Sequence, residues 1–173
     1  HECSSAASDV YKRQELWKSN NKSSNKDLII FMPGFGGDIK NFRWIGMELS
    51  QMGWPVLFID HKGSNSDSIS KAVDGTDVIP SSADIFLYRI KDLDLVIKSH
   101  INGKFDLKSD KYILMGHSLG ALIAFLYEGN LPQPGFEDRC DLALRDLAIT
   151  NLSKLIQCLS LIHISEPTRR PII

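Results

Sequence analysis

Three short apolar runs, separated by segments with helical spacing, most constrain the fold of this chain. The runs cover residues 28–32, 56–59 and 112–115, and no charged side chain interrupts them. Continuous apolar runs of this length are typical of strands that are buried on both faces of a parallel sheet. Parallel strands need crossover connections, which are usually helices. The sequence therefore predicts the α/β class, with a partial parallel sheet and crossover helices.

The helices predicted between the strands have recognisable ends. Gly53 follows the first helical pattern, as a C-terminal glycine would. Ser81, with Asp84 in the first turn, is predicted to begin the second helix. A third helix follows the last strand and extends through Tyr127. The apolar positions that recur at helical spacing in the first two helices are Phe42, Ile45, Leu49 and Met52, and then Phe86, Ile90, Leu93 and Ile97.

Three polar or turn-rich segments are predicted to lie outside the sheet and its crossover helices. Residues 15–26 and 61–81 are predicted as loops, and the second is long enough to be functional or an insertion. Residues 130–158 stand where a fourth strand would be expected. They are predicted to form a lid-like helical insertion over the rim of the sheet, with Asn151 as a helix cap.

The two ends of the chain are related to each other at the level of their codons. Residues 9–14 can be encoded by GATGTGTATAAGAGACAG, whose reverse complement translates to residues 159–164. Such ends resemble translated adapters of a transposon-type sequencing library, which are excluded from fold reasoning. We therefore expect residues 1–14 and 159–173 to be adapter-derived tails, and residues 15–158 to be part of a longer natural protein.

Composition excludes several classes of function. The chain has 173 residues, 43% of them hydrophobic, and a formal net charge of −1, which suits one globular domain. There is no basic field to attract nucleic acid. No apolar run approaches the roughly 20 residues of a transmembrane helix. The cellular compartment and the oligomeric state are left open.

The segment Gly116-His117-Ser118-Leu119-Gly120 fits the pattern Gly-x-Ser-x-Gly. It lies between a predicted strand and a predicted helix, where the chain must turn sharply to expose the serine hydroxyl. A side chain at either glycine would collide with neighbouring elements. We therefore predict that Ser118 is a nucleophile, in preference to an inert serine in a glycine-rich turn.

A serine that attacks a carbonyl needs hydrogen-bond donors for the negative charge that develops on the oxygen. One predicted donor is the backbone N–H of Leu119, which follows the serine at a helix N-terminus. The other is the backbone N–H of Phe35, in the glycine-rich loop of residues 33–37. A simple turn at the end of the strand is the alternative interpretation of that loop.

These motifs resemble those of the α/β-hydrolases, and within them the bacterial dienelactone-hydrolase-like and platelet-activating-factor-acetylhydrolase-like esterases. The resemblance extends over about residues 26–158, and it depends on residues 33–37, 58–65 and 116–120. It implies hydrolysis of a small ester, lactone, thioester or short-acyl lipid by a serine nucleophile, without metal or cofactor. One departure is Pro33-Gly34, where relatives commonly have His-Gly. A non-catalytic binding protein of the same fold is the alternative.

In this family the acid and the histidine of the triad follow the serine. Residues 119–158 contain no histidine, so we expect both partners to be missing and the isolated chain to be nearly inactive. His61 follows a strand and is a poor candidate for the base because of its chain order. His117 is predicted to pack under the turn, and His100 to be solvated. The later carboxylates are expected to be solvated as well: Glu128, Glu137, Asp138, Asp141 and Asp146.

Two further expectations concern the edges of this fragment. The third strand is predicted to lack a neighbour on one edge, which favours association and poor solubility. Cys140 and Cys158 flank the predicted insertion, either as two free thiols or as a disulfide. The apolar face of that insertion either covers an acyl pocket or packs on the sheet.

Overall fold

The computed structural model describes residues 14–19 and 26–129. The chain divides into two compact units, residues 1–127 and 128–173, and the helices and strands below all belong to the first. The predicted insertion, both predicted tails up to residue 13 and from residue 159, and the cysteines all lie outside the described residues. The statements made about them stay predictions.

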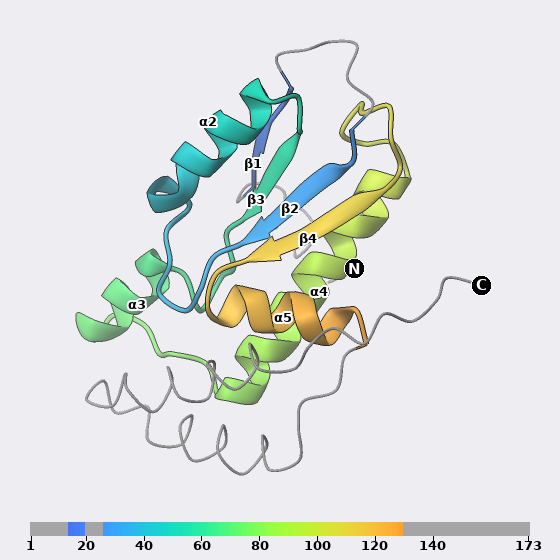
Figure 1. Ribbon diagram of the computed structural model, residues 1–173. Coiled ribbons are helices and arrows are strands. Elements are labelled where there is room, and N and C mark those ends of the chain that lie inside the picture. Colours follow the sequence, from blue (N-terminus) through green and yellow to red (C-terminus); the bar gives the residue numbers. More distant parts are fainter. Residues whose placement is uncertain (1–13, 20–25, 130–173) are drawn as a thin grey trace, which may run out of the picture. The chain divides into compact units, whose positions relative to one another are not determined.

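Four strands form one sheet in the order β1-β3-β2-β4. β2 is parallel to both β3 and β4, so the three predicted apolar runs are confirmed as neighbouring parallel strands (Figure 1). β2 is central, which brings the loop after β2 beside the turn after β4. The strands are β1 (Gln14–Trp17), β2 (Leu28–Met32), β3 (Val56–Ile59) and β4 (Tyr112–Gly116).

β1 corrects the prediction that residues 15–26 form a loop. This strand pairs antiparallel with β3, with Gln14 opposite Ile59 and Trp17 opposite Val56. Leu16 packs against one face of the sheet and Trp17 against the other. A four-residue strand is too short to show alternation in the sequence, and its pairing with the edge of β3 decides its conformation.

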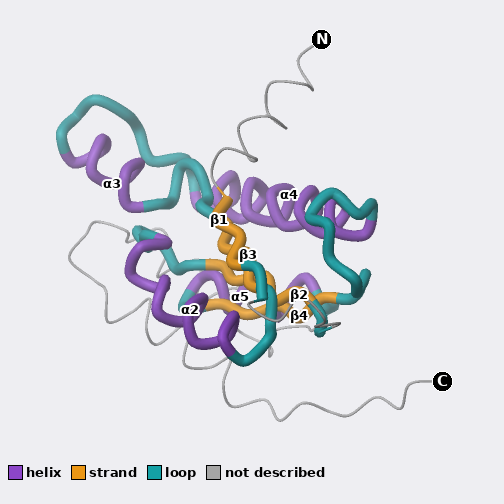
Figure 2. The backbone as a smooth tube through the Cα atoms, turned by 90° about the horizontal axis from the view of Figure 1, so that it is seen from above, coloured by secondary structure: helices purple, strands orange, loops and turns teal. Residues whose placement is uncertain are grey.

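The sheet lies between helices on both faces (Figures 1 and 2). Alternate strand residues point to opposite faces, and each set is part of a separate apolar cluster. Helices α4 and α5 cover the face of Leu28, Ile30 and Met32, while α2 covers the face of Ile29 and Phe31. The helical segments are η1 (Ile39–Phe42), α2 (Arg43–Gln51), α3 (Ser66–Val73), α4 (Ser82–Ile101) and α5 (Leu119–Tyr127).

The predicted ends of the helices are confirmed. Gly53 has a φ of 93°, as a glycine that follows a helix requires. The Ser81 hydroxyl accepts from the Asp84 backbone N–H at 3.2 Å and caps α4. The prediction that residues 61–81 form a loop is wrong in part, because α3 lies within it. Asn65 caps α3 by accepting from the Ser68 N–H at 2.9 Å, a local bond that outweighs the weak apolar pattern.

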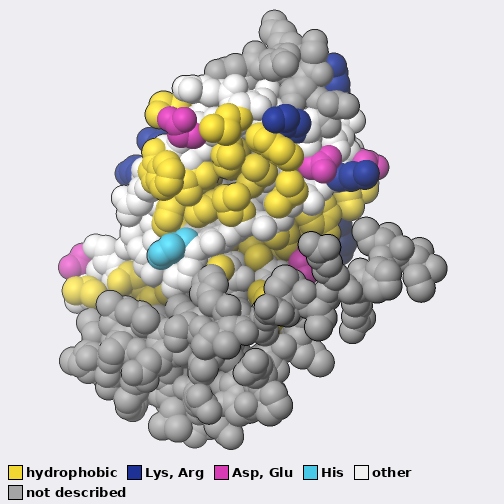
Figure 3. Space-filling model, viewed as in Figure 1, with side chains coloured by type: hydrophobic (Ala, Val, Ile, Leu, Met, Phe, Trp, Pro, Cys, Tyr) yellow, Lys and Arg dark blue, Asp and Glu magenta, His cyan; other side chains and the backbone are white. Residues whose placement is uncertain are grey.

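The surface around β4 is apolar. Hydrophobic side chains gather over β4 and the adjoining part of α2 (Figure 3). Ile113 in β4 is 39% exposed and Trp44 in α2 is 63% exposed. In the part of the chain that the structure describes, β4 pairs only with β2, as predicted for the third apolar run. None of the described helices has the length and apolarity needed to cross a bilayer.

Candidate active site

Ser118 occupies a strained turn between β4 and α5. Its φ is +53°, in the left-handed region, which costs a non-glycine residue roughly 1–2 kcal/mol. Residues held in this region cluster at functional sites, because the surrounding structure must stabilise them. The turn comes directly after Gly116, the last residue of β4, and α5 begins at Leu119. This strand-turn-helix geometry is the context that the Gly-x-Ser-x-Gly pattern requires.

The two glycines of the motif are required by space, as predicted. A Cβ atom at Gly116 would lie 2.4 Å from the carbonyl carbon of Gly120. A Cβ atom at Gly120 would lie 2.0 Å from the carbonyl oxygen of Met32. Both distances are far below van der Waals contact, and both obstacles are backbone atoms. The first glycine lets β4 turn back against α5, and the second lets α5 contact the end of β2.

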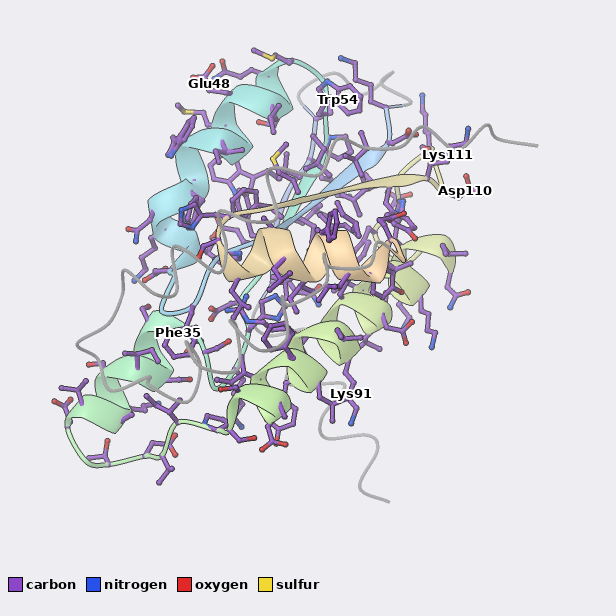
Figure 4. The ribbon with its side chains drawn as sticks, turned by 60° about the horizontal axis from the view of Figure 1, so that its bottom comes forward. Phe35, Glu48, Trp54, Lys91, Asp110 and Lys111 are labelled. Atoms are coloured by element: carbon purple, nitrogen blue, oxygen red, sulfur yellow. The ribbon has the colours of Figure 1, made fainter. Side chains whose placement is uncertain are left out.

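The serine turn is joined to the loop of residues 33–37. The backbone N–H of His117 donates to the carbonyl oxygen of Met32 at 3.0 Å. A Cβ atom placed on Gly34 would lie 3.0 Å from Cβ of Ser118. Figure 4 places Phe35 beside α3, at the opposite end of the molecule from Asp110 and Lys111, which precede β4. The two predicted motifs thus meet at the carboxyl ends of β2 and β4.

The two predicted oxyanion donors are available at this junction. Within residues 14–19 and 26–129, the backbone N–H groups of Phe35 and Leu119 donate to no other acceptor. The Leu119 N–H is at the first residue of α5, where unpaired amides and the helix dipole both favour a negative charge. Two such amides would suit a developing oxyanion.

Arg89 of α4 supports the loop that carries Phe35, and we did not predict this role from the sequence. Its side chain is buried, and its guanidinium donates to the Ser64 hydroxyl at 2.9 Å. It also donates to the carbonyl oxygens of Pro33 at 2.7 Å and Gly34 at 2.9 Å. A signal was present in the sequence, because residue 89 lies four positions from two buried apolar residues of α4, Ile85 and Leu93.

The environment of Arg89 affects its protonation. Desolvation by burial lowers the pKa of the guanidinium to about 10, although the negative charges of Asp92 and Asp60 act to raise it. Arg89 therefore stays positively charged at neutral pH. This charge lies directly behind the carbonyl groups of residues 33 and 34.

The segment after β3 packs against the same loop. The Gly36 N–H donates to the Ser64 carbonyl oxygen at 2.8 Å, and Gly37 forms a parallel bridge with Asn65. The Asn65 amide donates to the Asp60 carboxylate at 2.9 Å. The loop from Gly63 to Asn65, which carries part of the sequence resemblance, is thus a direct support for residues 34–37.

The environments of His100 and His117 differ from those that the sequence predicted. His61 lies in the interior, with Nδ1 2.9 Å from a carboxylate oxygen of Asp92 in α4. His100 is buried and not solvated, because its Nε2 lies 2.9 Å from the Lys111 carbonyl oxygen in the segment that returns to β4. The His117 side chain is exposed and its ring contacts that of Phe42, so it does not pack under the turn. Among the described residues, no histidine is hydrogen-bonded to Ser118.

The later carboxylates are only partly within the described residues. Glu128 is exposed, as predicted. The other four lie outside the described residues: Glu137, Asp138, Asp141 and Asp146. The predicted absence of the triad acid and histidine therefore stays a prediction.

Comparisons with known proteins bear on the fold and on the family of this chain. A search of curated proteins gave no significant match. Among solved structures, a ferulic acid esterase from Streptomyces cinnamoneus is 22% identical, with a TM-score of 0.49, and the match covers 62% of this chain and 34% of that one. A highly thermostable carboxyl esterase from Bacillus coagulans, solved with glycerol, is 16% identical, with a TM-score of 0.51, and the match covers 90% of this chain and 54% of that one.

This chain thus spans about a third and about half of the lengths of these two enzymes. The likeness to the second shows a shared fold. Residues 23–137, more than half of the chain, match the family model described as serine aminopeptidase, S33. That range includes β2 through α5 and both motifs of the candidate site. The chain therefore belongs to the serine aminopeptidase S33 family, which has the α/β-hydrolase fold.

Proposed function

We propose that this chain carries the nucleophile and the oxyanion donors of a serine hydrolase that cleaves small carboxylic esters, lactones or short-acyl lipids. The observation that carries the proposal is the left-handed conformation of Ser118, in contact range of the loop that holds Phe35. A binding protein would not need a strained serine at this turn. The carboxyl esterase with a similar fold supports esters as the substrate class, as does the resemblance of the Gly63 to Asn65 loop to that of dienelactone-hydrolase-like enzymes.

The proposed reaction begins when Oγ of Ser118 attacks the carbonyl carbon of the ester. The hydroxyl proton passes to a base, and the carbonyl oxygen becomes an oxyanion that accepts from the N–H groups of Phe35 and Leu119. Collapse of this intermediate breaks the bond to the alcohol, which leaves with a proton. Water then hydrolyses the acyl-serine by the same steps.

The described residues do not provide a base for Ser118. No described histidine is hydrogen-bonded to Ser118, and a serine without its base is a weak nucleophile at neutral pH. We therefore propose that the 173-residue chain reacts slowly, and that the triad acid and histidine lie outside the described residues.

The test is labelling of the 173-residue chain with a fluorophosphonate, followed by mass spectrometry of the labelled peptide. We expect slow phosphonylation of Ser118 alone, and its loss in S118A. The matched control is S70A, which removes an exposed serine of α3 and should leave labelling unchanged. Labelling that survives S118A, or none in the parent chain under prolonged exposure, would contradict the proposal.

Substrate class can be separated from reactivity with two sets of chromogenic compounds. We expect p-nitrophenyl esters of short acids to react faster than aminoacyl p-nitroanilides. Preference for the anilides would favour an aminopeptidase, as the description of the family suggests.

A further inference from the structure

We propose that Arg89 is a positioning residue that fixes the orientation of the Phe35 N–H. This N–H is one of the two donors of the proposed oxyanion hole. This inference rests on the proposed function, because it assigns a task in that reaction to a side chain that the substrate never touches. It is carried by three hydrogen bonds from one buried side chain to the support and the backbone of one loop.

The peptide group between Gly34 and Phe35 links Arg89 to the proposed donor. Its carbonyl oxygen accepts from Nη2 of Arg89 at 2.9 Å. The described residues contain no cis peptide bond, so the C=O and N–H of this planar group point in opposite directions. Because the oxygen is held toward α4, the N–H of Phe35 is directed away from Arg89. Rotation of this peptide would break the bond to Arg89 and turn the donor away.

The neighbouring peptide group is held in the same way. The carbonyl oxygen of Pro33 accepts from Nη1 of Arg89 at 2.7 Å. Two successive carbonyls thus bind the two terminal nitrogens of one planar guanidinium, and this arrangement restrains both peptide planes. The third bond, from Nε to Ser64, fixes the guanidinium itself. A lysine could not reproduce this geometry, because its ammonium is a single point.

The charge of Arg89 adds to the effect of its geometry. A carbonyl that accepts from a cation is polarised, which strengthens the N–H of the same peptide as a donor. The side chain is buried in the described structure, so solvent screens this interaction little. Two carboxylates near Arg89 have other partners and do not take the place of its three hydrogen-bond acceptors. Asp92 lies 2.9 Å from His61, and Asp60 accepts from Asn65.

The test compares fluorophosphonate labelling rates of Ser118 in three variants of the 173-residue chain. R89K keeps a positive charge but loses the paired contacts, and we expect labelling to be slower by about 10-fold or more, approaching the loss of a whole oxyanion donor. S64A removes only the acceptor of Nε, and we expect a loss of about threefold, the lower range for one hydrogen bond. H100Q is the control for stability, because His100 is also buried and hydrogen-bonded, but at the other end of β4.

Nuclear magnetic resonance of the same proteins separates this inference from the proposed function. We expect a coupling across the hydrogen bond from Arg89 Nη2 to the Gly34 carbonyl carbon, and a shift of the Phe35 amide resonance in R89K and S64A but not in H100Q. If labelling survives the loss of Ser118 while these two signals are present, the proposed function is contradicted, but the orientation of the peptide by Arg89 is not. Labelling of R89K at the parent rate, or a Phe35 amide unmoved in both variants, would overturn the role of Arg89. If R89K does not fold, the parent coupling and S64A decide the question.

Discussion

Gly34 and Ser118 approach each other so closely that a methyl group on Gly34 would lie 3.0 Å from Cβ of the serine. The same methyl group would lie 3.2 Å from Nδ1 and from the carbonyl oxygen of His117. These distances are tight without being impossible, so the neighbours would have to move by a few tenths of an ångström. The lack of a side chain at Gly34 thus helps to set the distance between the nucleophile and the loop.

G34A is therefore expected to fold and to react more slowly. The loop and the serine turn should separate slightly, and small misplacements of reacting groups cost up to about 100-fold per ångström. We expect the fluorophosphonate labelling rate of Ser118 to fall about 10-fold. The control is G75A, at a glycine with no neighbouring atom within 4 Å of the added carbon. If G34A is labelled at the same rate as G75A, the close approach of Gly34 to Ser118 does not affect the reaction.

S118G is expected to be more stable than S118A. Glycine adopts the φ of +53° without the steric cost that alanine and serine share, so the difference in free energy of unfolding should be about 1 kcal/mol. Urea unfolding of both variants measures it. Asp106 has the same φ outside the site, and aspartate tolerates it better, so D106G should gain less over the parent. Equal stability of S118G and S118A would mean that the turn stores no strain.

G120A is expected to prevent the native fold. The added carbon would lie 2.0 Å from a backbone oxygen of β2, and overpacking against backbone cannot be relieved by a side-chain rotation. We expect a loss of more than about 4 kcal/mol, seen as a missing thermal transition. G103A provides the comparison, because the φ of +74° at Gly103 is unfavourable for alanine but the space around it is open. A cooperative transition in G120A near that of G103A would disprove the packing argument.

Removal of the carboxylate that faces His61 is expected to destabilise the fold. D92A leaves a buried imidazole without its 2.9 Å partner, and losing the partner of a buried polar group typically costs about 1–3 kcal/mol. D67A removes an exposed partner of Lys71 on α3 and should cost less than about 1 kcal/mol. Chemical denaturation compares the two. A similar, small change in both variants would show that the His61 contact contributes little.

The contribution of Arg89 to stability is expected to be independent of pH in the neutral range. Burial lowers the pKa of this cation to about 10, so below that pH the folded and unfolded chains both hold the proton. Between about 10 and the higher ordinary pKa of arginine, only the unfolded chain holds the proton, and this group then makes stability rise with pH. The difference in unfolding free energy between the parent and R89Q should be flat from about pH 6 to about pH 9. A titration midpoint of this free-energy difference inside that pH range would contradict the pKa assigned to Arg89.

The features that the sequence predicted are those with local or periodic signals. The strands β2, β3 and β4 are continuous apolar runs, and Ser81 and Gly53 mark helix ends by local hydrogen bonding and by backbone conformation. The two glycines of the serine motif were predicted for the steric reason that the structure gives.

The features that were missed depend on contacts between distant segments. β1 is a strand because β3 offers an unpaired edge, and His100 is buried because the chain returns past it before β4. The residue type of Arg89 predicts a position at the surface, since an arginine is rarely buried. Only its acceptors, which lie about 55 residues earlier in the chain at Pro33 and Gly34, make that burial favourable.

Residue 89 lies near the middle of α4, a helix of 20 residues packed on the sheet. The loop after β2 is therefore anchored to a long rigid element, and displacing it would break two hydrogen bonds to one guanidinium at once. A buried guanidinium that has lost these acceptors is costly, so the loop is preformed in the free protein. Induced fit or gating at this site must then come from other segments of the molecule.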